Sequence, residues 1–220
     1  MSARPPETRP PENRPLSASA RGSRAHPGAP GGYGAAVSTP TQNRPTAPSE
    51  GPGAPVLVLV GPPGAGKTSV GERLAARLGV PVTDTDAVLA EQAGRSVAEL
   101  FIDVGEERFR ELESAVVADA FARPGVLVLG SGAVEGATAL LERYRAQGGT
   151  VVFLDVSLSA GMPRVGLNAP RTVTLGSPRA QFSSMAQQRR PLYAGHATAV
   201  IDTSGLGVDE VVDRVGAVVS

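Results

Sequence analysis

The sequence predicts a three-layer α/β/α fold in which a five-stranded parallel sheet lies between helices. Two observations from residue 56 onward support this prediction. Short runs of β-branched residues alternate with stretches of helical periodicity, which is typical of parallel strands joined by crossover helices. The runs are also apolar along almost their whole length, as expected for strands that helices cover on both faces.

The elements follow one another with a helical crossover between each pair of strands. The first strand is predicted at 56–60, and the stretch SVGERLAARLG after it places Val70, Leu74, Ala75 and Leu78 on one helical face. The other strands are predicted at 82–85, 126–129, 150–156 and 198–203. The other helices are predicted at 96–102, 104–122, 136–147, 178–190 and 208–219.

The composition sets limits on size and partners. With 220 residues, 41% of them hydrophobic, the chain can bury a substantial core in one domain with an appendage. The net charge is zero, so overall charge does not indicate nucleic acid or an anionic membrane as a partner. Apolar runs such as PVLVLV are too short to cross a bilayer and no leader-like segment opens the sequence, so we expect a cytoplasmic protein. The lack of cysteine excludes disulfides and thiolate metal sites.

Residues 1–54 differ in composition from the rest of the chain. They are rich in Pro, Gly, Ser and Arg and nearly free of large aliphatic residues, so we expect a disordered tail, with 55–220 as the folded domain. Six arginines against three glutamates give the tail a charge of +3. The repeated RPPE also fits a polyproline ligand for an adaptor module.

Residues 57–69, LVLVGPPGAGKTS, match the phosphate-loop pattern G-x-x-x-x-G-K-[ST] and lie between a predicted strand and a predicted helix. The glycines let the backbone wrap around phosphate oxygens, and the helix N-terminus adds partial positive charge. We expect Lys67 to reach the β- and γ-phosphates and Thr68 to hold Mg²⁺. Lys67 is the single lysine among 21 basic residues, which suggests that a compact ammonium is needed there. The alternative is a glycine-rich turn that binds nothing.

Asp84 and Asp86 follow the apolar start of the second predicted strand. In an extended backbone their side chains project to the same face, and the carboxyl ends of parallel strands are where ligands bind. We therefore expect both carboxylates near Lys67 and the metal ion. The alternative for Asp84 is a simple N-cap of the next helix.

A phosphate loop alone indicates only that a nucleoside triphosphate is bound. The chain has no second-half repeat and no N-K-x-D motif of the kind that reads a guanine base, and its length after the tail suits a small phosphotransferase. Across 56–219 it resembles the shikimate kinase family. The resemblance rests on the phosphate loop and four further motifs, DTDAVLAEQAGRSVAELFIDVGEERFRELE (84–113), LVLGSGAV (127–134), VGLNAPR (165–171) and QQRRPLY (187–193).

The resemblance implies a fold like that of the nucleoside monophosphate kinases. It also implies Mg²⁺-dependent transfer of the γ-phosphate of ATP to the 3-hydroxyl of shikimate, a step of chorismate biosynthesis. ATP and shikimate are then the expected partners, and we expect a monomer that binds neither nucleic acid nor a membrane.

Carried over by position, the resemblance assigns four sets of residues. Lys67, Asp86 and Arg171 are the implied catalytic residues, and Thr68 and Asp84 the implied magnesium ligands. The implied ATP site comprises Gly61, Gly64, Ala65, Gly66, Lys67, Thr68, Ser69, Arg164, Arg171 and Leu206. The implied shikimate site comprises Asp86, Arg110, Ser131, Gly132 and Arg189, with Glu113 orienting Arg110 and Gly130 close to the ring. Val97, Phe101 and Phe109 are implied either as the apolar wall of that site or as ordinary core residues.

By resemblance, segment 161–176 occupies the place of the family's lid, with Arg171 closing over the phosphates. Three departures from the family pattern bear on closure of this lid and on nucleotide affinity rather than on reaction type. The family usually reads GGG where this chain has Gly130-Ser131-Gly132, and RPLL where Arg171 is followed by Thr-Val-Thr. Near the end, Leu206 stands where Arg and Pro are often found beside adenine. Two alternatives remain open at this point. One is a related kinase of another polyol acid such as gluconate, and the other is a nucleotide-binding module with impaired turnover.

Overall fold

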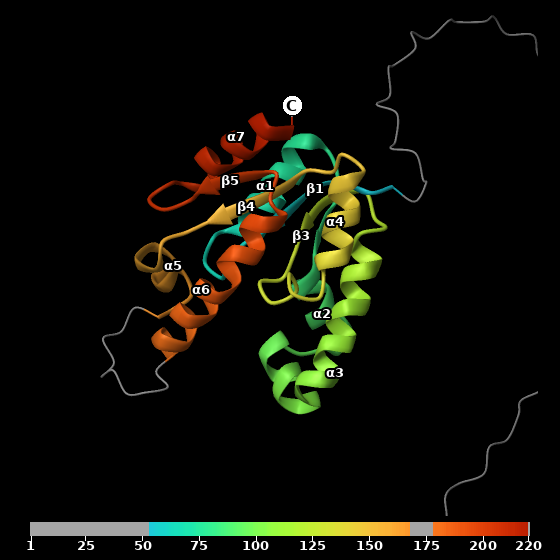
Figure 1. The fold of residues 1–220 in the computed structure, drawn as a ribbon, viewed down its shortest axis with the longest axis vertical. Helices are drawn as coiled ribbons and strands as arrows, with labels where there is room; N and C mark the ends of the chain where they lie inside the picture. The colour runs from blue at the N-terminus through green and yellow to red at the C-terminus, as the bar shows by residue number, and fades with distance from the viewer. Residues whose placement is uncertain (1–52, 168–177, 220) are drawn as a thin grey trace, which may run out of the picture. The chain divides into compact units, whose positions relative to one another are not determined.

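The computed structural model of the protein describes residues 53–167 and 178–219. Five strands form one parallel sheet in the order β2-β3-β1-β4-β5 (Figure 1). They are β1 (Pro55–Val60), β2 (Val82–Asp84), β3 (Gly125–Val128), β4 (Val151–Asp155) and β5 (Ala199–Asp202). The predicted five-stranded parallel sheet is confirmed, with strand ends within one or two residues of those expected from sequence. The predicted tail lies almost entirely outside the described residues.

Seven helices are found in the described part of the chain. They are α1 (Lys67–Leu78), α2 (Thr85–Ala93), α3 (Val97–Ala120), α4 (Thr138–Ala146), α5 (Leu158–Arg164), α6 (Pro178–His196) and α7 (Val208–Val219). α2 and α5 were not among the predicted helices. α2 lacks a clear apolar stripe, and α5 is only seven residues long and contains both Gly161 and Pro163, so neither has a strong helical signal.

Alternating side chains of the strands build a core on each face of the sheet. Leu57 and Leu59 of β1 pack with residues of α1 and α7 on one face. Val58 and Val60 pack on the other face with residues of α3, α4 and α6. The three-layer arrangement expected from the apolar strands is therefore confirmed (Figure 1).

α2 and the first part of α3 form a smaller packing unit beyond the sheet, in the lower part of Figure 1. Leu89, Leu100, Phe109 and Val116 make its core. α3 bends at Gly105, whose φ of 75° and ψ of 170° are not helical. The two helices predicted at 96–102 and 104–122 also imply an interruption, but at residue 103, two residues before Gly105.

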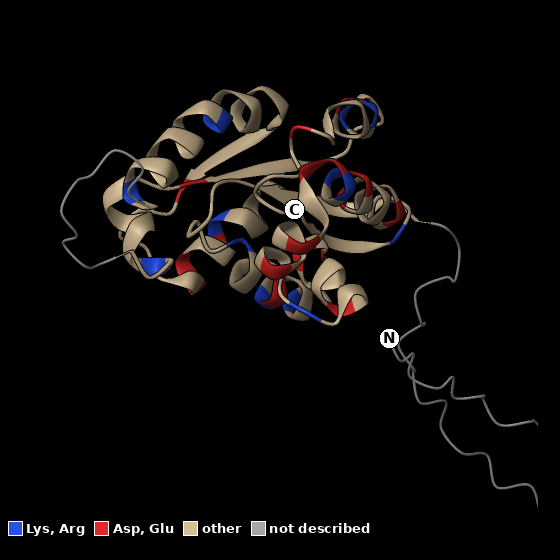
Figure 2. Cartoon of the chain, turned by 90° about the horizontal axis from the view of Figure 1, so that it is seen from below, with Lys and Arg blue, Asp and Glu red and all other residues tan. Residues whose placement is uncertain are grey.

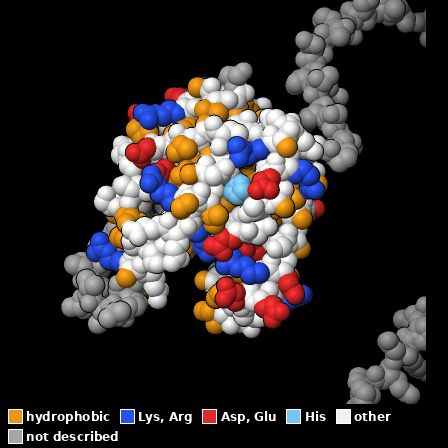
Figure 3. Space-filling view, viewed as in Figure 1, with side chains coloured by type: hydrophobic (Ala, Val, Ile, Leu, Met, Phe, Trp, Pro, Cys, Tyr) orange, Lys and Arg blue, Asp and Glu red, His pale blue; other side chains and the backbone are white. Residues whose placement is uncertain are grey.

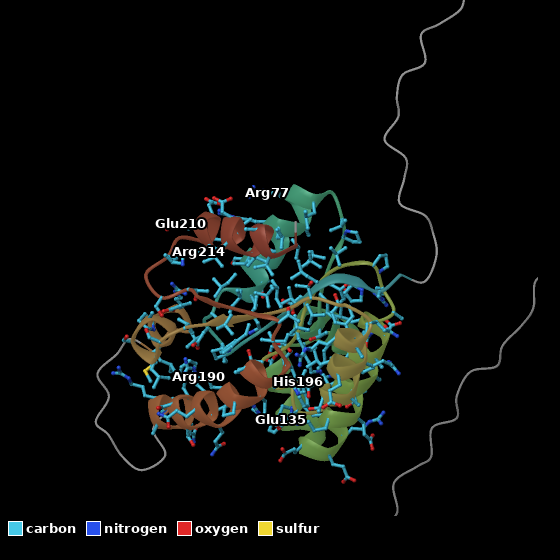
Figure 4. All side chains as sticks on the ribbon, turned by 45° about the horizontal axis from the view of Figure 1, so that its top comes forward. Arg77, Glu135, Arg190, His196, Glu210 and Arg214 are labelled. Carbon is cyan, nitrogen blue, oxygen red and sulfur yellow. The ribbon has the colours of Figure 1, made fainter. Side chains whose placement is uncertain are left out.

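Exposed ion pairs join the first and last helices. Arg73 pairs with Asp209 and Arg77 with Asp213, so α7 is attached to the helix that follows the phosphate loop. Figure 4 shows Arg77 of α1 close to α7, which carries Glu210 and Arg214. Elsewhere acidic and basic residues are interspersed (Figure 2). In 53–167 and 178–219, no helix has the length and apolar character required to span a membrane.

Candidate active site

The phosphate loop follows β1, the central strand of the sheet, at its carboxyl end. Gly61, Gly64 and Gly66 have φ values of 147°, 79° and 89°, which L side chains rarely adopt. A Cβ added to Gly61 would lie 2.3 Å from the carbonyl oxygen of Leu154, so the loop also needs glycine for space. α1 begins after Gly66 without a hydrogen bond from a capping side chain of any described residue. Its first N–H groups can therefore bind an anion.

Lys67 is buried in this loop, with a side chain directed toward the residues after β3. Its Nζ donates hydrogen bonds to Gly61 O (2.9 Å), Pro62 O (3.2 Å) and Ser131 Oγ (2.7 Å). Burial lowers the pKa of Lys67 to about 8, while the carboxylates of Asp86 and Asp84 oppose this shift. Oxygen acceptors thus hold the ammonium in place, but burial makes its charged form less favourable. A bound anion such as a phosphate would stabilise the charged form.

Asp84 lies at the end of β2 and uses its two oxygens in different ways. Oδ1 accepts from the backbone N–H groups of Asp86 (3.0 Å) and Ala87 (3.3 Å) and so caps α2. Oδ2 accepts from Thr68 Oγ1 at 2.7 Å. The helix cap that the sequence left as an alternative is therefore present together with the contact to the phosphate loop.

Asp86 lies in the first turn of α2 and faces the same space as Lys67. Burial, followed by the carboxylate of Asp84, raises the pKa of Asp86, and the Lys67 ammonium acts in the opposite direction. A raised pKa brings a carboxylate closer to the range in which it can accept a proton from a hydroxyl at neutral pH.

Three consecutive residues after β3 each face a different part of the site. A Cβ added to Gly130 would lie 2.2 Å from Asp86 Oδ1, so the carboxylate lies directly against this backbone. Ser131 accepts the hydrogen bond from Lys67. A Cβ added to Gly132 would lie 3.1 Å from Arg110 Nη1 and 3.8 Å from Arg189 Nη2. Segment 130–132 therefore joins the carboxylate, the ammonium and a pair of guanidinium groups.

Arg110 and Arg189 come from α3 and α6 and converge on Gly132. Arg110 donates to Glu113 Oε2 at 2.7 Å, and Arg189 Nε donates to Glu135 Oε1 at 2.7 Å. Each guanidinium is thus held by one glutamate, and the Nη groups of both lie beside the same glycine. Figure 3 shows this face of the molecule hollowed between α6 and the first part of α3, with acidic and basic side chains together on the α3 side.

The apolar residues near the arginines are mostly core residues. Phe109 is buried with Leu89, Leu100 and Val116, and Val97 packs against this group, as the core alternative expects. The rings of Phe101 and Phe109 pack edge to face with their centroids 5.2 Å apart, but Phe101 remains 40% exposed. Of the three residues, Phe101 is therefore the most accessible to a ligand, while Val97 is partly buried.

A pocket of about 590 Å³ surrounds the phosphate loop. It is lined by loop residues, Asp86 and Ser131, and on its far side by Arg164, Val165, Thr203 and Leu206. Arg164 donates to Gly64 O at 3.2 Å and to Thr203 O at 3.1 Å, which ties the end of α5 to the loop after β5. Apart from Gly61, the predicted ATP residues of the described part therefore line one cavity. Arg171 lies outside the described residues.

Sequence reasoning missed three residues that shape the site. Thr85 Oγ1 accepts from Gly130 N at 2.8 Å, and Tyr193 OH donates to Ser131 O at 2.6 Å, so both fix segment 130–132. Burial raises the pKa of Tyr193, which keeps the phenol a donor. Glu135 holds Arg189. Thr85 and Tyr193 lie inside the motifs DTD and RRPLY, but only the folded chain shows what they contact.

A parallel sheet with a phosphate loop after its central strand, and a pocket with converging arginines beside that loop, is typical of the class of P-loop nucleotide-dependent kinases of small molecules. Comparisons with known proteins make the assignment specific. The model of the shikimate kinase family matches residues 63–220. The chain belongs to the shikimate kinase family.

Individual relatives agree with the family match. A shikimate kinase of Thermobifida fusca is 46% identical over 153 residues, which are 68% of this chain and 86% of the relative. A shikimate kinase of Salinispora arenicola is 46% identical over 170 residues, 76% of this chain and 99% of the relative. Among solved structures, the shikimate kinase from Acinetobacter baumannii in complex with shikimate superposes with a TM-score of 0.65 at 28% identity, covering 76% of this chain and 92% of that one.

Proposed function

We propose that this protein is a shikimate kinase that transfers the γ-phosphate of ATP to the 3-hydroxyl of shikimate. The observation that carries the proposal is the meeting of Asp86, Lys67, Arg110 and Arg189 at segment 130–132, within a chain of this family. A small ring acid requires a carboxylate clamp and a base close to the terminal phosphate, and these groups supply both.

The two arginines account for the choice of an anionic substrate. Each uses one N–H for its glutamate, so other N–H groups near Gly132 remain for a carboxylate. Glu113 and Glu135 keep the guanidinium groups oriented and balance their charge until the substrate arrives. Binding the carboxylate here places the ring against segment 130–132.

The chemical step then uses a base beside the ring and cationic groups around the phosphates. The oxygen of the 3-hydroxyl forms a bond to the γ-phosphorus, the bond from that phosphorus to the β–γ bridging oxygen breaks, and ADP leaves with the electron pair. The hydroxyl proton passes to the carboxylate of Asp86, whose raised pKa suits this role. Lys67 neutralises charge on the phosphates. Arg171 lies outside the described residues. Its role in closing over the phosphates, which the resemblance implies, therefore stays a prediction.

The residues beside the phosphate loop fit Mg²⁺. Thr68 Oγ1 and Asp84 Oδ2 are hard oxygen donors 2.7 Å apart. Within the described ranges no group of three or more His, Cys, Asp or Glu side chains could hold a metal alone, which agrees with an ion that takes its other ligands from phosphates and water. When bound with the nucleotide, Mg²⁺ neutralises charge that develops on the β- and γ-phosphates.

A coupled assay of ADP release tests the proposal. With ATP and Mg²⁺, shikimate should stimulate ADP release well above the ATP-only background. Gluconate and the methyl ester of shikimate should give little, because one has no ring and the other no carboxylate. Equal rates with the ester, or no stimulation by shikimate, would rule the proposal out.

A matched pair of variants on α3 tests the clamp. Arg110→Ala should lower kcat/KM for shikimate about 100-fold, since an arginine contact to a carboxylate is lost. Arg108→Ala is the control, because Arg108 also pairs with a glutamate three residues on, Glu111, but is exposed. The kcat/KM of Arg108→Ala should stay close to that of wild type.

That the protein is monomeric and cytoplasmic remains an expectation. Gel filtration of the full chain tests whether it is a monomer.

A further inference from the structure

The hydroxyl of Ser131 lies in the nucleotide pocket, next to Lys67. Ser131 lines the cavity around the phosphate loop, and its Oγ is 2.7 Å from Lys67 Nζ. The next residue, Gly132, lies against the guanidinium groups of Arg110 and Arg189. The hydroxyl is therefore situated at the junction between the nucleotide side and the acid side of the site, where a phosphoryl group in transfer has to pass.

The backbone on either side of Ser131 holds this hydroxyl in place. The Ser131 carbonyl accepts from Tyr193 OH at 2.6 Å, and Tyr193 is 1% exposed. Gly130 N donates to the buried Thr85 Oγ1 at 2.8 Å. Anchors on both sides mean that the hydroxyl is positioned before any ligand binds, which reduces the entropy lost when it makes a contact.

The hydrogen-bonding capacity of Ser131 is only partly used. Its oxygen accepts a hydrogen bond from Lys67, and within the described residues its O–H donates no hydrogen bond. The other two N–H groups of the Lys67 ammonium donate to Gly61 O and Pro62 O, which belong to the phosphate loop itself. When a triphosphate enters, the contact to Ser131 is the one that Lys67 can exchange for a phosphate oxygen.

We propose that the Ser131 hydroxyl is an additional ligand of the terminal phosphate of bound ATP, donating its O–H to a γ-phosphate oxygen next to Lys67. This inference rests on the proposed function for the use of ATP but not for the identity of the acid. Ser131 then stabilises the phosphoryl group from the side of the acceptor, where neither the phosphate loop nor α1 reaches. It acts on the nucleotide rather than only on the shikimate ring.

Nucleotide titrations without shikimate test this contact directly. Kd is measured with Mg²⁺ for ADP and for the β,γ-imido analogue of ATP, in wild type, Ser131→Ala and Ser131→Gly. Both variants should bind the analogue about ten- to a hundredfold more weakly, as expected for one lost hydrogen bond to a charged group. Binding of ADP should change less than twofold, because ADP lacks the γ-phosphate. Ser184→Ala, an exposed hydroxyl of α6, should leave both values unchanged.

Each other outcome opposes the proposal. Equal loss of ADP and analogue binding would mean that Ser131 supports the phosphate loop in general. Tighter binding of the analogue would mean that the hydroxyl only occupies a hydrogen bond of Lys67 that the nucleotide must displace.

Turnover adds a second readout, because kcat should fall in Ser131→Ala with KM for shikimate unchanged. A rise in KM for shikimate alone would assign Ser131 to the acid instead. The titrations contain no shikimate, so they are valid whichever acid the enzyme phosphorylates.

Discussion

Replacing Lys67 by methionine should abolish turnover and at the same time change how stability depends on pH. Lys67 is buried, and burial lowers its pKa from 10.5 to about 8. In the unfolded chain the lysine is exposed to water, so its pKa is close to the ordinary value. Between the two values the folded protein has lost the proton that the unfolded chain still carries.

The size and sign of the effect follow from this difference. From pH 8 to pH 10.5 the unfolded state binds more protons, so the contribution of Lys67 to the free energy of unfolding rises with pH, by about 3 kcal/mol over the window. Below pH 8 both states are protonated, and the fold carries the full penalty of a buried ammonium. Lys67→Met removes this penalty, so the advantage of the variant over wild type should shrink by about 3 kcal/mol from pH 7 to pH 10.5.

Urea unfolding at pH 7 and pH 10.5 measures the difference. Far-UV circular dichroism is the suitable signal, because the chain has no tryptophan. Arg77→Met on the exposed face of α1 is the control, since arginine stays protonated at both pH values and its effect should not change. The compared quantity is the difference in free energy of unfolding between wild type and Lys67→Met. If it changes by less than about 1 kcal/mol between the two pH values, which is within the error of extrapolation, the assignment of this pKa to Lys67 is refuted.

Two further predictions concern the loop after β3 and the tail. Gly132→Ala should raise KM for shikimate about tenfold with a smaller change in kcat, because the new Cβ would lie 3.1 Å from Arg110 Nη1 in the space of the clamp. Gly136→Ala, whose Cβ would meet nothing closer than Ser114 Oγ at 3.5 Å, is the control, and equal effects of the two would contradict the placement. Deleting residues 1–52 should leave the melting temperature and kcat/KM near those of the full chain. A truncated protein that fails to fold would show that the domain does not begin where the composition changes.

The fold was largely predictable because its signals are local. β1 and β4 are short apolar runs with β-branched residues, and the break of α3 at Gly105 showed as two separate helical patterns. α2 was missed as an element although its cap, Asp84, was recognised as a possible N-cap. α5 was missed because Gly161 and Pro163 resemble the beginning of a loop.

The candidate site was predictable where a motif fixes the spacing, and not where contacts depend on tertiary structure. Lys67 and Thr68 follow from the phosphate loop, whereas Arg110 and Arg189 were assigned only by family resemblance and meet across two helices. Glu135 is 54 positions from Arg189 in sequence, and no local pattern indicates that they pair. Their roles in catalysis and binding stay predictions.

The tripeptide Gly130-Ser131-Gly132 has a consequence for how substrate choice in such an enzyme could change. It lies against the carboxylate of Asp86, the ammonium of Lys67 and the guanidinium groups of Arg110 and Arg189. A substitution there lies next to all of these groups, so a change that alters the fit of the acid also meets the groups proposed for phosphoryl transfer. Divergence toward other acids is therefore expected to begin at peripheral positions such as Phe101, where a side chain can vary while the reacting groups keep their alignment.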